Sequence, residues 1–327
     1  MKAKIVFDLK QLVTKSFLLP SLRNVIHRSD DFITMRNRLH RFRIFFISAD
    51  TGIILKFVYI TFKKNIKMKI AVCGKGGVGK TTISGLLSRL LGKGGLPVLA
   101  IDGDTNPNLG HILGIEQSDA SMPSLSTKLM DIVEEMGGRK YVKLNTPLPE
   151  IIDTYGLKAQ DNVTLLAVGQ PDHAGTGCMC GLHITVREII HAALEEGEQI
   201  TVLDLEASLE QMKRGTSRYV DILFCVIEPY YRSMEAAARF YRLGKELEIK
   251  KIVAVANKVK NVEDEKAILE FCRQIDLPIE AIIPLDPVLA DADKKGAFNV
   301  DDIHNSPAID AIRELAKKLT TGKFSAS

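Results

Sequence analysis

The stretch that most constrains this chain is "GKGGVGKTT", Gly74–Thr82, which follows the apolar run "KIAVC" and precedes a helical pattern. It satisfies the spacing G-x-x-x-x-G-K-[ST], in which glycines let backbone N–H groups turn inward around phosphate oxygens. The N-terminus of the following helix adds a partial positive charge. The stretch therefore predicts a strand, a phosphate-binding loop and a helix in succession, with a nucleotide bound at the loop.

The last residues of this loop are expected to bind different parts of a Mg²⁺-nucleotide. Lys80 is placed to reach the β- and γ-phosphates, and the Thr81 hydroxyl to ligate Mg²⁺. The other nucleotide-binding candidates of the loop are Gly76, Gly77, Val78, Gly79 and Thr82. We expect ATP and Mg²⁺ as the cofactors of this site.

From Met68 onward, short β-branched runs alternate with helical patterns. The predicted strands are 69–73, 97–102, 163–168, 199–205, 221–227, 252–257 and 279–283. The predicted helices lie near 80–92, 183–196, 233–247, 262–275 and 306–319. Continuous apolar strands separated by helices indicate an α/β fold, a P-loop NTPase with a mostly parallel central sheet covered by helices on both faces. Residues 116–160 read as a polar, helix-leaning surface insertion.

Residues 1–67 differ from the rest in charge and pattern. They carry 14 Lys and Arg against 4 Asp, whereas 68–327 carry 30 Lys and Arg against 36 Asp and Glu. They lack helical periodicity, and charges at Asp50 and Lys56 interrupt their longest apolar run, so no membrane span is predicted. We expect a basic extension, unstructured or outside the natural start, followed by one P-loop ATPase domain at 68–327.

The phosphate loop carries a second lysine, Lys75. With it, "GKGGVGKTT" resembles the deviant P-loop of a dimeric ATPase superfamily that includes the nitrogenase iron protein and the septum-placement and plasmid-partition ATPases. The resemblance implies that Lys75 reaches the partner's nucleotide across an ATP-dependent homodimer and neutralises developing charge. In the stretch "AIDGDTNPNLG" it also implies that Asp104 positions the attacking water and that Asn108 is the second polar residue of the first switch.

Further polar residues follow the predicted strands. Asp204 ends "ITVLD", where a Walker B acid belongs, and Asp102 could serve catalysis or form a turn. In "ANKVK", Asn257 is a base-site candidate, and Lys260 stands where guanine readers have Asp, so ATP is favoured over GTP. Asp286 is a further candidate for the base pocket.

Two of the five cysteines stand in the glycine-rich stretch "GTGCMCG". Cys178 and Cys180 supply two thiolates, half of a four-coordinate site, ahead of a helix whose N-terminus should lower their pKa values. Two copies meeting on a two-fold axis would complete an S₄ site for Ni²⁺ or Zn²⁺. His173 and His183 could replace two of these ligands locally, but solvent-facing or capping roles are the favoured interpretation for both. Cys73, Cys225 and Cys272 lie in apolar patterns and are expected to be buried.

The order of deviant P-loop, "DGDTNPNL", "GCMCG" and "DLEASLEQMKRGT" resembles the family of CO dehydrogenase nickel-insertion accessory ATPases. The resemblance covers 68–327 and implies metal bound at the paired cysteines of an ATP-closed dimer that serves a nickel- or cluster-containing client enzyme. The second switch departs from the family pattern, with Ser208, Gln211 and Met212 in place of Gly, His and Leu. These changes leave the client's identity open.

Two other functions remain open. An electron-transfer ATPase like the nitrogenase iron protein would hold an intersubunit [4Fe–4S] cluster, but that family has a cysteine just after the second switch, and 204–216 contain none. A septum or partition ATPase would need a basic patch or an amphipathic helix, and the region 68–327 is net acidic. We therefore expect no nucleic-acid or membrane partner. Cysteine usage without a secretory signal indicates the cytoplasm.

Overall fold

The computed structural model describes five short strands within residues 26–54, and then 66–104, 108–115, 129–134, 140–167, 179–196, 199–205, 220–295 and 305–322. The chain divides into two units, Met1–Asn65 and Ile66–Ser327. In the first unit, three strands form an antiparallel sheet in the order β1 (Ile26–Ser29), β2 (Phe32–Arg36) and β3 (Arg41–Phe45). Strands β4 (Ile47–Ala49) and β5 (Gly52–Ile54) form a separate antiparallel ribbon.

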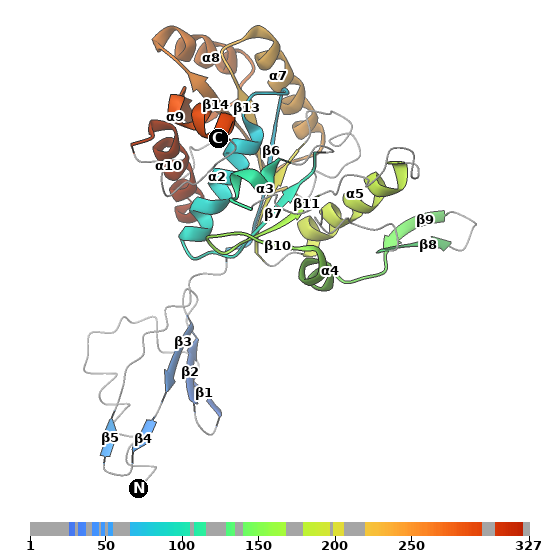
Figure 1. Ribbon diagram of the computed structural model, residues 1–327, viewed down its shortest axis with the longest axis vertical. Helices are drawn as coiled ribbons and strands as arrows, with labels where there is room; N and C mark the ends of the chain where they lie inside the picture. The colour runs from blue at the N-terminus through green and yellow to red at the C-terminus, as the bar shows by residue number, and fades with distance from the viewer. Residues whose placement is uncertain are drawn as a thin grey trace. The chain divides into compact units, whose positions relative to one another are not determined.

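The second unit is built on an eight-stranded sheet with the order β10-β11-β7-β12-β6-β13-β14-β15 (Figure 1). Its strands are β6 (Met68–Gly74), β7 (Val98–Asp102), β10 (Leu157–Lys158), β11 (Val163–Ala167), β12 (Ile200–Asp204), β13 (Ile222–Ile227), β14 (Lys251–Val259) and β15 (Ile279–Pro284). All neighbours pair in parallel except β10 with β11. The carboxyl ends of the central strands therefore meet at one edge of the sheet.

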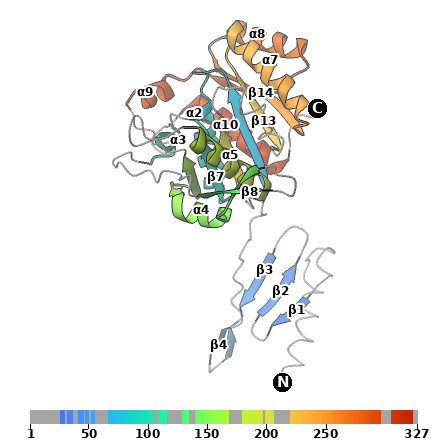
Figure 2. The ribbon, with the colours of Figure 1, turned by 90° about the vertical axis from the view of Figure 1, so that its right-hand side faces the viewer.

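Helices cover both faces of this sheet, as the view turned by 90° shows (Figure 2). They are α2 (Lys80–Lys93), α3 (Leu109–Ile112), α4 (Leu148–Tyr155), α5 (Met179–Glu196), α7 (Tyr231–Glu246), α8 (Val262–Gln274), α9 (Pro287–Lys295) and α10 (Pro307–Thr321). The core residues form two clusters, one with α2, α3 and α10 and the other with α4, α5, α7 and α8. Successive side chains of a strand point to opposite faces of the sheet, so they belong to different clusters. In β6, Ile70 and Val72 belong to the first cluster, and Ala71 and Cys73 belong to the second.

The predicted α/β architecture is confirmed, and each of the seven predicted strands and five predicted helices is present, with shifted ends. One boundary differs in a way that matters: α5 begins at Met179 rather than near His183. The first turn was not predicted because it contains Gly181, a poor helix former, and shows no helical repeat of apolar residues. Cys180 therefore lies within the helix instead of in a loop before it.

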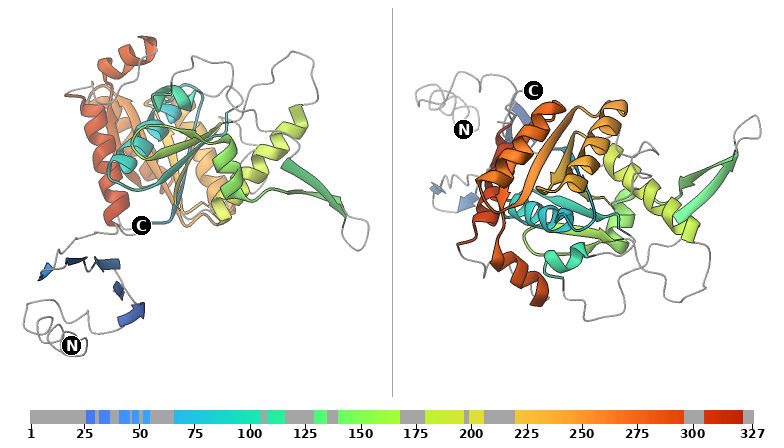
Figure 3. Two further views of the ribbon diagram at one scale, coloured as in Figure 1. Left: turned by 60° about the horizontal axis from the view of Figure 1, so that its bottom comes forward. Right: turned by 90° about the horizontal axis from the view of Figure 1, so that it is seen from above.

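The prediction of a helix-leaning insertion at 116–160 is wrong for its centre. Strands β8 (Met130–Glu134) and β9 (Lys140–Leu144) form an antiparallel hairpin that projects beyond α5 (Figure 3). The β-branched residues Ile132, Val133 and Val142 favour a strand over a helix in these segments. Pro147 is the N-cap residue of α4, and Pro149 lies in the first turn of that helix, where proline is tolerated.

Cys73, Cys225 and Cys272 are buried free thiols, as predicted. Cys73 and Cys225 are register partners on β6 and β13, with their sulfurs 3.7 Å apart. Burial raises the pKa of Cys272 to about 12, so this thiol stays protonated at neutral pH. Among the described residues, no helix is both long enough and apolar enough to cross a membrane.

Candidate functional site

The phosphate loop joins β6 to α2 at the carboxyl edge of the sheet. Its backbone has left-handed φ values at Gly77 (83°) and Gly79 (92°), which side chains rarely adopt. A Cβ on Gly79 would also lie 2.5 Å from the Asn257 amide nitrogen. Gly74 is equally constrained, because its Cβ would come 2.7 Å from the carbonyl oxygen of Val226. The local geometry of this loop thus requires glycine at positions 74, 77 and 79, whereas a Cβ on Gly76 would meet no atom within 4 Å.

The two lysines of the loop lie in opposite environments. Lys80 is the first residue of α2 and only 8% of it is exposed, so its ammonium group stays within the site. Lys75 is exposed to solvent. The predicted roles, in which Lys80 serves its own nucleotide and Lys75 that of a partner, stay predictions.

The Walker B candidate Asp204 ends β12 and lies beneath the loop. Its carboxylate accepts hydrogen bonds from the Thr81 side chain and from Ser84 Oγ, the latter at 3.4 Å. Burial raises the pKa of Asp204 to about 7, and the nearby Asp102 adds to the effect. A hydroxyl and a desolvated carboxylate together form a set of hard oxygen donors that suits Mg²⁺. Ser84, one turn after Thr81 on the same helix, was not among the predicted site residues.

Asp102 ends the neighbouring strand β7 and is fully buried. Its two carboxylate oxygens accept hydrogen bonds from the backbone N–H groups of Leu109 (2.8 Å) and Asp104 (3.1 Å). Burial raises the pKa of Asp102 to about 6 despite these bonds. Of the two alternatives that the sequence left open, the structure supports the turn-forming aspartate: Asp102 holds the segment that carries Asp104.

Asp104 is half-buried at this edge, and Asn108 occupies the N-cap of α3. Both therefore lie on the segment that follows β7, next to the strand that delivers Asp204. Residues 105–107 between them are outside the described part of the chain.

Asn257 and Lys258 approach the loop from β14, two strands away from β6. Asn257 Nδ2 donates a hydrogen bond to the carbonyl oxygen of Val78 at 2.7 Å, and Lys258 Nζ donates to that of Gly77 at 2.6 Å. Lys258 also pairs with Glu228 Oε1 at 2.7 Å. The sequence placed Asn257 at the nucleotide, but it gave no role to Lys258 or Glu228. The N-K dipeptide after a strand was the available signal.

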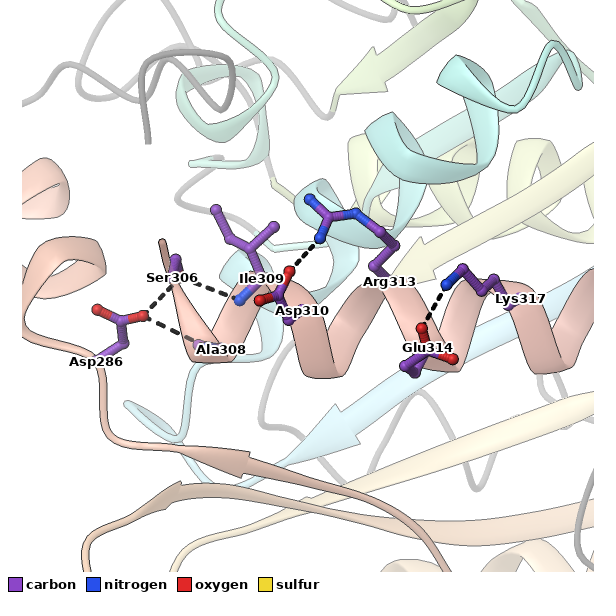
Figure 4. Close-up of polar contacts among 8 residues, drawn as sticks. All are labelled: Asp286, Ser306, Ala308, Ile309, Asp310, Arg313, Glu314 and Lys317. Atoms are coloured by element: carbon purple, nitrogen blue, oxygen red, sulfur yellow. Dashed lines mark hydrogen bonds and ion pairs between the residues drawn. The ribbon is translucent and has the colours of Figure 1, made fainter. Parts of the chain in front are cut away.

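Asp286 has a different role from the one that the sequence suggested. Its carboxylate accepts hydrogen bonds from Val288 N in α9 (2.9 Å), from Ser306 Oγ (2.5 Å) and from Ala308 N in α10 (3.4 Å). Figure 4 shows Asp286 pointing toward Ser306 and the first turn of α10. Asp286 is buried and holds two helix N-termini, a structural task.

The cysteine pair lies at the edge of what the structure describes. Cys178 is outside the described residues, and for Cys180 and His183 only the helical backbone is described. His173 and the second-switch residues Ser208, Gln211 and Met212 are also outside them. Within the described part of the chain, no group of three or more His, Cys, Asp or Glu side chains could hold a metal ion.

The comparison that decides the family covers most of the second unit. Residues 69–300 match the CobQ/CobB/MinD/ParA nucleotide binding domain. The chain belongs to this family. It is therefore a P-loop ATPase of the MinD/ParA type, as the deviant phosphate loop predicted.

Two individual proteins are similar to the chain over 70% or more of its length. It is 36% identical over 234 residues to the carbon monoxide dehydrogenase accessory protein CooC of Rhodospirillum rubrum, covering 70% of this chain and 88% of CooC. It is 33% identical over 254 residues to an uncharacterized ATP-binding protein of Methanocaldococcus jannaschii, covering 73% of this chain and 96% of that protein.

Solved structures of the MinD/ParA family share the fold. The septum site-determining protein MinD of Pyrococcus horikoshii, complexed with Mg-ADP, superposes with a TM-score of 0.58 at 21% identity, covering 78% of this chain and 96% of that one. The MinD cell division protein of Aquifex aeolicus has a TM-score of 0.54 at 22% identity, covering 77% and 97%. At this level of identity, the similarity establishes the architecture alone.

Proposed function

We propose that this chain is an ATP-dependent dimeric ATPase that carries a metal ion and assists the maturation of a nickel- or cluster-containing enzyme in the cytoplasm. The observation that supports this best is the similarity to CooC, an accessory protein of carbon monoxide dehydrogenase, over 88% of CooC. The net acidic charge of residues 68–327 favours a protein client over nucleic acid or an anionic membrane surface.

ATP would be held by the phosphate loop. The backbone of residues 76–79 and the Lys80 ammonium group bind its phosphates, with Thr81 and Thr82 at the start of α2. Thr81, hydrogen-bonded to Asp204, would hold Mg²⁺, which neutralises phosphate charge when it is bound. Asp104 would orient the attacking water from the segment that Asp102 fixes.

The exposed Lys75 would act in the partner's site. Its side chain is exposed, so a second copy facing this edge could receive its ammonium group beside the phosphates. A cation supplied across the interface makes hydrolysis depend on dimerisation, in the manner of an arginine finger.

The metal ion is the cargo, and Cys178 and Cys180 would bind it. Cys178 directly precedes α5 and Cys180 lies in its first turn, where the partial positive charge of an 18-residue helix favours thiolates. Two copies supply four thiolates, a set that suits Zn²⁺ or Ni²⁺. ATP would close the dimer and bring the half-sites together, and reopening after hydrolysis would separate them. The difference in metal affinity between the two states is what releases the ion.

The test is anaerobic metal analysis and size-exclusion chromatography of the full chain, with and without ATP. We expect about one Ni²⁺ or Zn²⁺ per dimer, bound more tightly with ATP and lost in Cys178→Ser/Cys180→Ser. Iron and sulfide with a visible charge-transfer band would replace this proposal with an electron-transfer ATPase. No metal in the unmodified protein would refute the carrier function.

The matched control is Cys272→Ser. It removes one thiol from a buried position in α8, where burial raises the pKa of Cys272 to about 12. Because that thiol is not a thiolate at neutral pH, this variant should retain the metal. Equal metal loss in this control and in the Cys178/Cys180 variant would show that the loss reflects general damage rather than removed ligands.

A further inference from the structure

Strand β14 carries an irregularity where it passes the phosphate loop. Its pairing with β15 shifts register between Ala256 and Val259, so Asn257 and Lys258 are the bulged residues. Lys258 has a left-handed φ of 56°, a conformation that a lysine rarely adopts. Bulges next to functional sites re-aim side chains, and backbone strain there persists only when the surrounding contacts maintain it. The bulge thus indicates that the directions of the Asn257 and Lys258 side chains are important for the phosphate loop.

The two re-aimed side chains bind two successive carbonyl groups of the loop. Asn257 Nδ2 lies 2.7 Å from the Val78 oxygen, and Lys258 Nζ lies 2.6 Å from the Gly77 oxygen. Because a trans peptide group is planar, fixing each carbonyl also fixes the N–H of the next residue on the opposite side. The contacts therefore set the directions of two N–H groups in the loop that receives phosphate. The Val78 N–H donates to the Lys75 carbonyl oxygen at 3.3 Å, which closes the turn of the loop, and the Gly79 N–H follows it at the start of α2.

The lysine is itself held by a carboxylate from the neighbouring strand. Glu228 directly follows β13, and its Oε1 lies 2.7 Å from Lys258 Nζ. Glu228 is largely shielded from solvent, with 14% of its side chain exposed. Its own backbone N–H donates to Ser233 Oγ, which fixes the turn into α7. A flexible lysine side chain thus has its ammonium group confined between two acceptors.

We propose that Lys258, held by Glu228, is a positioning residue of the nucleotide site. It keeps the Gly77–Gly79 backbone in its phosphate-accepting conformation before nucleotide arrives. Its contribution is to nucleotide affinity, through slower dissociation, rather than to the rate of hydrolysis at saturation. The inference rests on the nucleotide loop and is independent of the metal proposal.

The experiment measures fluorescent ADP binding and dissociation by stopped flow, and ATP hydrolysis at saturation, for Lys258→Met in the full chain. A charge-assisted hydrogen bond to the loop is removed, so we expect the Kd for ADP to rise by about tenfold or more, mainly through faster dissociation. Hydrolysis at saturating ATP should stay within about threefold of the unmodified protein, since the groups that act on the γ-phosphate remain.

Glu228→Gln provides the second arm, because it keeps the shape of the side chain and removes its charge. It should raise the Kd for ADP by less than Lys258→Met does. In the double variant it should add nothing, since Glu228 acts only through Lys258. If the effects of the two changes on the free energy of ADP binding were fully additive, Glu228 would not act through Lys258, and this part of the proposal would be wrong.

Lys250→Met is the matched control. Lys250 pairs with Asp221 at 2.6 Å, and these residues directly precede β14 and β13, at the opposite end of the same two strands. Lys250→Met removes an ion pair between the β13 and β14 segments and leaves the contacts of the phosphate loop unchanged. Unchanged ADP affinity in Lys258→Met, or an equal loss in Lys250→Met, would overturn the proposal.

Discussion

Asp102 and Asp204 are register partners at the carboxyl ends of the adjacent strands β7 and β12. Both carboxylates are buried, and burial raises their pKa values, to about 6 for Asp102 and to about 7 for Asp204. Two neighbouring acids with raised pKa values create a site that favours a cation. The sheet topology therefore places an unfavourable pair of charges where the chemistry of phosphate transfer needs Mg²⁺.

The first prediction concerns Asp204→Asn and the pH dependence of stability without nucleotide. The pKa of Asp204 is about 7 in the folded protein and near 3.8 when exposed, so the folded state binds more protons between these values. Its contribution to the free energy of unfolding therefore falls as pH rises from about 4 to 7. Relative to the unmodified protein, the variant should gain roughly 3 kcal/mol between pH 4 and pH 8.

Urea denaturation at a series of pH values measures this difference, and Asp131→Asn on the exposed β8–β9 hairpin controls for the loss of one negative charge. ATP hydrolysis by Asp204→Asn should be lost at every pH. A stability difference from the unmodified protein that does not change with pH would show that Asp204 is ionised at the same pH in both states.

The second prediction separates the two loop lysines. Lys75→Ala should bind ATP with nearly unchanged affinity if this exposed side chain serves the partner's site rather than its own. Its hydrolysis should fall by about 10³-fold, the usual effect of removing a cation supplied in trans. Lys80→Ala should instead lose ATP affinity.

Fluorescent nucleotide binding and phosphate release distinguish these outcomes, with Lys158→Ala on β10 as a control for the loss of one surface charge. Mixing Lys75→Ala with a hydrolysis-deficient Asp204→Asn chain should restore part of the activity if each lysine serves the partner's site. Hydrolysis by Lys75→Ala at the unmodified rate would show that Lys75 is only a solvated charge.

The third prediction concerns the packing of α2 on the turn between β10 and β11. A Cβ on Gly92 would lie 1.7 Å from the backbone carbonyl oxygen of Asp161. The side-chain carboxylate of Asp161 is held by Arg89, whose Nε lies 2.9 Å from Oδ2. Because backbone on both sides would have to move, Gly92→Ala should destabilise the protein by about 3 kcal/mol. Lys93→Ala, at the next and exposed position of the helix, should change stability by less than about 0.5 kcal/mol. Thermal denaturation of the two variants measures the contrast.

Much of the fold is predictable from the sequence because its strands are buried on both faces. Runs such as "ILFCVI" at Ile222–Ile227 contain no polar alternation, and only a covered parallel sheet accommodates them. The loop residues are predictable for a similar reason, since glycines and the Lys80–Thr81 pair at fixed spacing have few other uses. Local pattern and chemistry agree in these segments.

Other features depend on contacts between distant segments. The N-K dipeptide marks Lys258 as a candidate, but no local pattern predicts the bulge that directs its side chain to Gly77, 181 positions away. Asp286 likewise read as a site residue because its local sequence could not reveal Ser306 as its partner, 20 positions on. In both cases the tertiary structure, rather than the residue type, decides between a functional and a structural role.

The last prediction tests the structural role of Asp286. Asp286→Ala removes the acceptor for Val288 N and Ser306 Oγ at the starts of α9 and α10, and leaves the buried Ser306 hydroxyl without this acceptor. Loss of a helix cap costs about 1 kcal/mol, and loss of a buried partner costs a similar amount, so we expect roughly 2 kcal/mol of destabilisation. Asp310→Ala is the matched control, because Asp310 forms only an exposed ion pair with Arg313 on the same helix (Figure 4). Urea denaturation should separate the two variants, while both retain the ADP affinity of the unmodified protein. A loss of ADP affinity in Asp286→Ala that exceeds its loss of stability would return Asp286 to the nucleotide site.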